Sequence, residues 1–241
     1  ADQFNITATT SVNMLDGGAG DDGFRITGDA VLTTTIEGGL GSDTVEFGVP
    51  ASAADGSRLI GDLNLGLELG ETDVIDFSGS NLAQKVEATA DANNEQSGTI
   101  TQFSVSVVDL ITGNFTGAED FTGNGLGQLV GPNSDTFWHI TNTNTGTFGN
   151  SLASIAANNF TNFSILGGSG NDTVIFATTA NVELDGGMPA SPFAVEGFDG
   201  GLGTNTLMGS IGNDSFVITG PDSINYTNPN GGQTRLENID I

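Results

Sequence analysis

One short pattern recurs five times in this chain and places a polar oxygen directly after a glycine-rich turn. The pattern is Gly-Gly-x-Gly-x-Asp, followed two residues later by a large apolar residue. Asn205 replaces the Asp in one copy, and Ser210 replaces the second Gly in another. The five copies span residues 17–25, 38–46, 167–175, 200–208 and 209–217.

The chemistry that suits this pattern is the binding of a hard cation. Glycine adopts positive φ without steric cost, so a Gly-rich segment can turn sharply and direct several carbonyl oxygens to one side. The acidic residue adds a charged oxygen, and Ca²⁺ takes six to eight oxygen ligands of these kinds. Tight turns without any ion also use Gly, Asn and Asp. We nevertheless expect Ca²⁺ at some of these corners, with the candidate ligands Asp16, Asp22, Asp43, Asp73, Asn171, Asp172, Asp185, Asp199, Asn205 and Asp214.

The pattern resembles the nonapeptide repeats of RTX proteins, which include secreted bacterial toxins, proteases, adhesins and surface-layer proteins. The resemblance covers about 45 residues at the level of the motif. It implies that the Gly-rich half wraps a calcium ion and that the apolar half is a short strand. The chain departs from the family because only residues 200–217 hold two copies in tandem. A regular β-roll is therefore not expected.

The net charge and the missing cysteines support the same view. The chain carries 30 acidic residues against four basic ones, a formal net charge of −26, and it has no cysteine. Such a chain repels nucleic acids, and its self-repulsion destabilises a compact fold unless cations neutralise it. Disulfides and thiolate metal sites are excluded. No apolar run approaches the length of about 20 residues that spans a membrane. We expect an extracellular or cell-surface protein with neither a nucleic-acid partner nor membrane insertion.

Short alternating segments that end at Gly, Asn or Asp indicate β-strands. The spacing of the phenylalanines, from 18 to 23 residues in the clearest cases, is typical of solenoid coils. We therefore predict an all-β, irregular right-handed parallel β-helix or β-solenoid, with a β-sandwich as the alternative. Three regions are expected: 1–80 and 165–241 with Gly-Gly-Asp turns, and an Asn/Thr-rich region over 81–164. The predicted strands are residues 4–7, 24–27, 44–47, 74–77, 103–108, 173–176 and 216–219.

An enzyme is not expected. The single histidine, His139, adjoins the single tryptophan, Trp138, and the two could bind a sugar, but a structural pair on a strand is the simpler interpretation. Asp21 and Asp22 could form a glycosidase pair, although a cation-binding turn suits them better. A polysaccharide-active β-helix enzyme is thus the weakest alternative.

Both ends of the sequence look like unpaired coils. Residues 1–7 read like the second half of a nonapeptide and match residues 213–219, while residues 236–241 resemble the strands that precede Gly-Gly turns. Such ends fit either a fragment of a longer repeat protein or a subunit whose uncapped coils stack head to tail into fibres or layers. The sequence therefore favours a calcium-dependent, self-assembling structural protein that is its own partner. The alternative is an RTX-type adhesin module that binds a surface glycan or protein.

Overall fold

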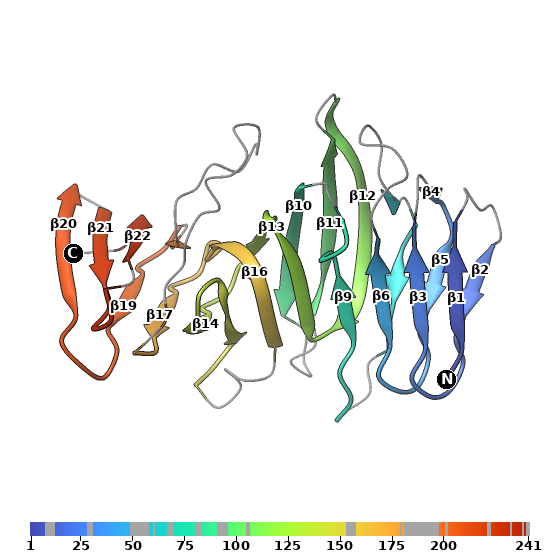
Figure 1. Cartoon of the computed structure of the whole chain (residues 1–241), viewed down its shortest axis with the longest axis horizontal. Coiled ribbons are helices and arrows are strands. Elements are labelled where there is room, and N and C mark those ends of the chain that lie inside the picture. Colours follow the sequence, from blue (N-terminus) through green and yellow to red (C-terminus); the bar gives the residue numbers. More distant parts are fainter. Residues whose placement is uncertain are drawn as a thin grey trace. The chain divides into compact units, whose positions relative to one another are not determined.

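The structure is a computed structural model. It describes the chain apart from residues 8–12, 28–30, 49–57, 60, 67–69, 81–82, 91–95, 105–106, 153–157, 179, 181–197, 201, 221–222, 232, 238 and 240–241. Within the described residues, every regular element is a β-strand (Figure 1). No helix in this part of the chain is long and apolar enough to cross a membrane. The prediction of an all-β protein is confirmed.

The chain divides into two units. Unit 1 holds Ala1–Val86 and Asp91–Asn124, and unit 2 holds Glu87–Ala90 and Gly125–Ile241. The boundary falls within two strands, β10 (Ala83–Ala90) and β13 (Asp120–Val130). The other strands of unit 1 are β1 (Gln3–Ile6), β2 (Met14–Asp16), β3 (Gly23–Ile26), β4 (Val31–Leu32), β5 (Thr35–Glu37), β6 (Thr44–Phe47), β7 (Arg58–Leu59), β8 (Leu63–Asn64), β9 (Val74–Asp76), β11 (Gln96–Ser104) and β12 (Val107–Ala118). Those of unit 2 are β14 (Phe137–Asn142), β15 (Thr145–Gly149), β16 (Asn158–Leu166), β17 (Thr173–Phe176), β18 (Phe198–Asp199), β19 (Thr206–Met208), β20 (Ser215–Gly220), β21 (Ser223–Thr227) and β22 (Gln233–Glu237).

Unit 1 is built on two parallel strand ladders. One runs β1, β3, β6, β9 and the first residues of β13, and the other runs β2, β5, β8 and β12. The Gly-rich turns connect strands of the second ladder to strands of the first, as from β2 to β3 and from β5 to β6. Strands β4 and β7 form a separate parallel pair, and β11 and β12 form a long antiparallel hairpin.

Unit 2 repeats this arrangement and adds antiparallel strands. The parallel ladders are β14–β17–β19 and β16–β18–β22. Strands β14, β15 and β16 also pair antiparallel, as do β20, β21 and β22.

Alternation along each short strand forms the core. In β6, Val45 and Phe47 are buried while Thr44 and Glu46 point outward, because successive side chains of a strand face opposite sides. Equivalent apolar residues stack from strand to strand, as do the rings of Phe4 and Phe24, whose centroids are 4.7 Å apart. The largest buried side chain of unit 2, Trp138, stacks on Phe148 at 4.9 Å. Each unit therefore has an apolar interior lined by in-register rows of side chains.

The Gly-rich turns themselves stack closely. Gly18 accepts a hydrogen bond from the Leu40 N–H at 2.9 Å, and the same contact joins Leu202 to Gly168 in unit 2. At Gly39, φ is +104°, and a Cβ atom would lie 2.0 Å from the Gly18 carbonyl oxygen. Glycine is therefore required there by the approach of the next backbone as well as by the backbone conformation.

Candidate functional site: stacked acidic corners

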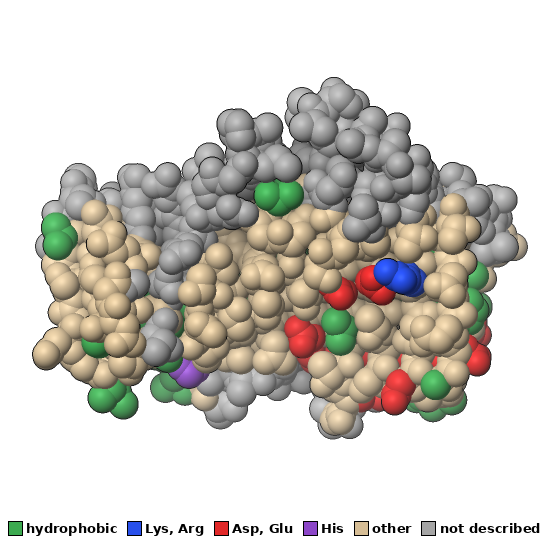
Figure 2. Space-filling model, viewed as in Figure 1, with side chains coloured by type: hydrophobic (Ala, Val, Ile, Leu, Met, Phe, Trp, Pro, Cys, Tyr) green, Lys and Arg blue, Asp and Glu red, His purple; other side chains and the backbone are tan. Residues whose placement is uncertain are grey.

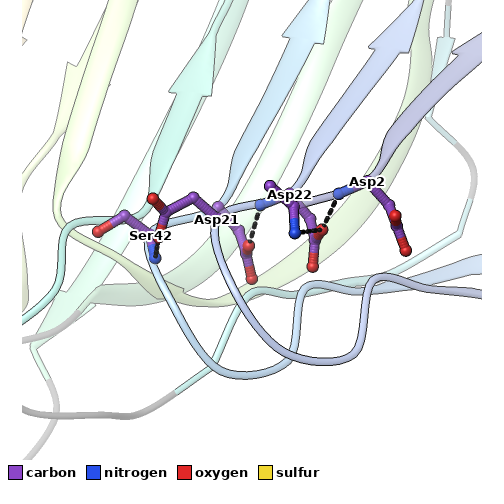
Figure 3. A network of polar contacts seen from close by, with 6 residues as sticks. Asp2, Asp21, Asp22 and Ser42 are labelled. Carbon is purple, nitrogen blue, oxygen red and sulfur yellow. Dashed lines mark hydrogen bonds and ion pairs between the residues drawn. The ribbon is translucent and has the colours of Figure 1, made fainter.

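The acidic residues that directly precede the strands of one parallel ladder form a continuous series of hydrogen bonds in unit 1. We call it the inner ladder: the backbone N–H of each such residue donates to the side chain of the equivalent residue one coil further along. The Asp22 N–H donates to Asp43 at 2.8 Å, the Asp43 N–H to Asp73 at 2.7 Å, and the Asp73 N–H to Glu119 at 2.7 Å. Asp2 begins the series by donating to Asp22 (Figure 3).

The residues just before the inner ladder form a second one that runs in the opposite direction. In this outer ladder, the Ser42 N–H donates to Asp21 at 3.1 Å, and the Thr72 N–H donates to Ser42 Oγ at 2.9 Å. The inner carboxylates are buried, whereas Asp21 and Thr72 are exposed. Adjacent residues of an extended chain point to opposite sides, which explains why each turn ends in one inward and one outward side chain.

Unit 2 contains the same two ladders. On the inner side, the Thr136 N–H donates to Asp172 and the Asp172 N–H donates to Asn205, both at 2.9 Å. On the outer side, the Asn171 N–H donates to Asp135 and the Thr204 N–H donates to Asn171, both at 2.8 Å. The chain therefore builds the same acidic corner twice, with an amide in place of a carboxylate at Asn205.

The second carboxylate oxygen of the inner residues faces other oxygen atoms. Asp22 Oδ2 and Asp172 Oδ2 are buried and accept no hydrogen bond. A Cβ atom on Gly17 would lie 2.6 Å from both Asp22 Oδ2 and the Gly38 carbonyl oxygen. At Gly167 the corresponding distances are 2.5 Å to Asp172 Oδ2 and 2.6 Å to the Gly200 carbonyl oxygen. The unbonded carboxylate oxygen and the carbonyl oxygen thus border the same small space, where a proton or a cation would stabilise them.

Burial changes the protonation of these carboxyl groups. Desolvation, reinforced by the charges of Glu119, Asp43 and Glu71, raises the pKa of Asp73 to about 8 although the Asp43 N–H opposes the shift. Desolvation likewise raises the pKa of Asp172 to about 7, against the hydrogen bonds from Thr136. In the absence of a cation, part of the inner ladder therefore carries protons near neutral pH.

The predicted ligand residues occupy four kinds of position. Five of them, Asp22, Asp43, Asp73, Asp172 and Asn205, form rungs of the inner ladders, and Asn171 belongs to the outer ladder. Asp16 and Asp199 end β2 and β18, where they are in register with Glu37 of β5 and Glu237 of β22. Asp214 accepts hydrogen bonds from Ser210 Oγ and Tyr226 Oη, both at 2.9 Å. Asp185 lies outside the described residues.

Sequence reasoning missed Glu119 and Thr136 as rungs. Neither follows a Gly-Gly-x-Gly turn, although each directly precedes a strand with a buried aromatic residue two positions later, as Asp22 does. That spacing is the signal that could have found them.

The corners supply oxygen atoms of the right kind for Ca²⁺, namely buried carboxylates and backbone carbonyls. In the described part of the chain, no three His, Cys, Asp or Glu side chains gather as a metal site would require. Backbone carbonyls or water would therefore have to complete the coordination of any ion. Figure 2 shows acidic side chains over the strands of unit 1, where Arg25 pairs with Glu46 at 3.1 Å.

The alternative catalytic groups are poorly placed for that role. Trp138 is fully buried, so its ring is not available to stack on a sugar at the surface. Asp22 is buried and Asp21 is exposed, so the two carboxylates do not flank a common site.

The chain matches no protein-family profile, no curated protein and no solved structure.

Substituting Asp172 by Asn should have opposite effects with and without calcium. Without metal near pH 8, the variant should be more stable by roughly 1–2 kcal/mol, because a buried charge is removed and the amide can donate to the Gly200 carbonyl. With calcium, the variant should lose most of the stabilisation that the ion gives to unit 2. Urea unfolding under both conditions measures this.

The matched control is Asp135→Asn, which changes an exposed carboxyl group of the outer ladder one coil earlier. It should change the free energy of unfolding by less than about 0.5 kcal/mol in either condition. Equal responses of the two variants to calcium would contradict an ion at the Asp172 corner.

Proposed function

We propose that this protein is an extracellular, calcium-binding structural protein that assembles head to tail into a fibre or surface layer. Its chain is coiled as an irregular right-handed parallel β-helix, with calcium at the acidic corners. The parallel pairing of strands many residues apart supports the coil, because the sheets of a β-sandwich pair antiparallel. Parallel crossover connections are right-handed in nearly all proteins.

The observation that carries the proposal is the buried, unbonded carboxylate oxygen at two of the corners. Asp22 Oδ2 and Asp172 Oδ2 lie in the interior without a hydrogen-bond partner, and each borders the same small space as the carbonyl oxygen of the next turn. Keeping such carboxylates in a chain with a net charge of −26 is costly unless a cation compensates them. Divalent cations are abundant outside the cell, and Ca²⁺ prefers this oxygen chemistry.

Assembly is supported by strand edges and apolar side chains at the ends of the ladders. Among the described residues, β1 pairs only with β3, and β20 pairs only with β21. Phe216, Val217 and Ile211 are exposed by 46%, 54% and 93%, respectively, which is unusual for large apolar side chains in one short segment. An open strand edge beside exposed apolar residues favours addition of another strand.

Particle size in calcium and in chelator tests the function. With calcium, electron microscopy and light scattering at rising protein concentration should show filaments or sheets. In excess EGTA the particles should revert to monomers, because the acidic ends then repel each other. Monomeric particles at every concentration in calcium would contradict the assembly function. A glycan-array signal from such monomers would instead favour an adhesin module.

A further inference from the structure

The register of head-to-tail contact can be derived from a six-residue pattern that the chain uses three times. The pattern is Asp-x-Phe-x-Ile-Thr, and it occupies residues 2–7, 22–27 and 214–219. The first two copies are paired in the structure: Phe4 lies opposite Phe24 and Ile6 opposite Ile26, in parallel strands. Their rings stack with an interplanar angle of 4°.

The third copy, in β20, lacks an equivalent partner. Its Phe216 is 46% exposed, whereas Phe24 is 1% exposed. Its Asp214 carboxylate bonds locally to Ser210 and Tyr226, so this residue does not act as an acceptor rung for another coil. In the inner ladder, however, a residue joins the next coil through its backbone N–H, and that role does not need the carboxylate.

The first coil has the complementary features. Asp2 donates its N–H to Asp22, and nothing in the described part of the chain donates to the Asp2 carboxylate. The edge of the first coil therefore presents an acceptor for a further coil.

We infer that β20 of one copy of this chain pairs in parallel with β1 of a second copy, with Phe216 opposite Phe4 and Ser215 opposite Gln3. This inference rests on the proposed head-to-tail assembly and specifies its contact. The contact repeats the β1–β3 pairing within the chain: the Asp214 N–H donates to the Asp2 carboxylate. Each copy carries a net charge of −26, so the contact forms only when calcium is bound.

The absence of cysteine allows this register to be tested by crosslinking. Gln3 and Ser215 are both exposed, and the inferred pairing places their Cα atoms about 4.8 Å apart, within the range of a disulfide. The double variant Gln3→Cys, Ser215→Cys should therefore form a series of covalent oligomers under mild oxidation in calcium. On a non-reducing gel these should disappear after reduction, and they should not form in EGTA.

The matched control moves one cysteine by two residues along the same strand. In Asn5→Cys, Ser215→Cys, the offset places the Cα atoms about 8 Å apart, beyond disulfide reach. Oligomers should be at least tenfold fewer than with the in-register pair. Equal crosslinking of both pairs, or a crosslink confined to monomers, would overturn the inferred register.

If the wild-type chain assembles in calcium but the in-register pair of cysteines does not crosslink, the proposed function stands and the register fails. If the wild-type chain never assembles, both fail.

Discussion

Calcium at millimolar concentration is expected to raise the melting temperature of this protein by about 15 °C or more near pH 7.5. An ion at one hundred times its Kd contributes about 2.7 kcal/mol per site, and each kcal/mol moves the midpoint of a chain of this size by about 2–4 °C. Three corners pair a carboxylate Oδ2 with a carbonyl oxygen of the next turn: those at Gly17, Gly38 and Gly167. Differential scanning calorimetry of metal-free and calcium-loaded protein measures the effect.

The pH dependence of the protein's stability distinguishes a cation bound at the corners from a proton bound there. The pKa values of Asp73 and Asp172 are raised in the folded protein, so the fold holds protons more tightly than the unfolded chain does. Stability of the metal-free protein should therefore increase as the pH falls from about 8 towards 4. With calcium the trend should reverse, because protons compete with the ion for the same oxygens.

Magnesium at the same concentration serves as the control ion. It requires near-ideal octahedral geometry and gives up its water reluctantly, so it should raise the melting temperature far less than calcium does. Identical melting curves in calcium, in magnesium and without metal would exclude calcium as a structural ligand. The corners would then hold protons only.

Gly39→Ala is expected to destabilise unit 1 by about 3 kcal/mol or more. The new methyl group would lie 2.0 Å from the Gly18 carbonyl oxygen, so the stacked turns would have to separate, and φ of +104° adds strain. Urea unfolding at a low protein concentration, where assembly does not contribute, measures the loss.

Gly18→Ala separates the effect of backbone strain from that of the collision between turns. Gly18 has nearly the same φ, +89°, but no atom lies within 4 Å of an added Cβ. It should cost only about 1 kcal/mol, from backbone strain alone. Similar losses in both variants would show that close stacking of the turns contributes little to stability.

Local patterns in the sequence predicted the short strands well. Alternation identified β6 and β17 at their exact bounds and β3 and β9 within about one residue, because buried side chains alternate with outward-facing ones along each. The long hairpin of β11 and β12 was less visible. Ser104 pairs with Val107, and the two residues between them in the sequence, Val105 and Ser106, carry no Gly, Asn, Asp or Pro turn signal.

The candidate site was predicted only in part, because a local motif marks some of its residues and the stacking of strands determines the others. The Gly-rich motif identified Asp22, Asp43, Asp172 and Asn205, whose turns and rungs occur together in the sequence. Glu119 and Thr136 enter the ladders only because their strands stack next to Asp73 and Asp172. The outer ladder runs opposite to the inner one, and this direction could not be predicted from the sequence. It depends on which backbone N–H groups are left unpaired by the parallel strands.

The uneven spacing between rungs has a consequence for how such a chain can change. Successive inner rungs of unit 1 are separated by 20, 21, 30 and 46 residues, yet each makes the same contact with its neighbour. Stacking is thus indifferent to the length of chain between two rungs, and new segments can be inserted there without shifting the coils on either side. The chain is accordingly a scaffold into which foreign peptides could be inserted between rungs.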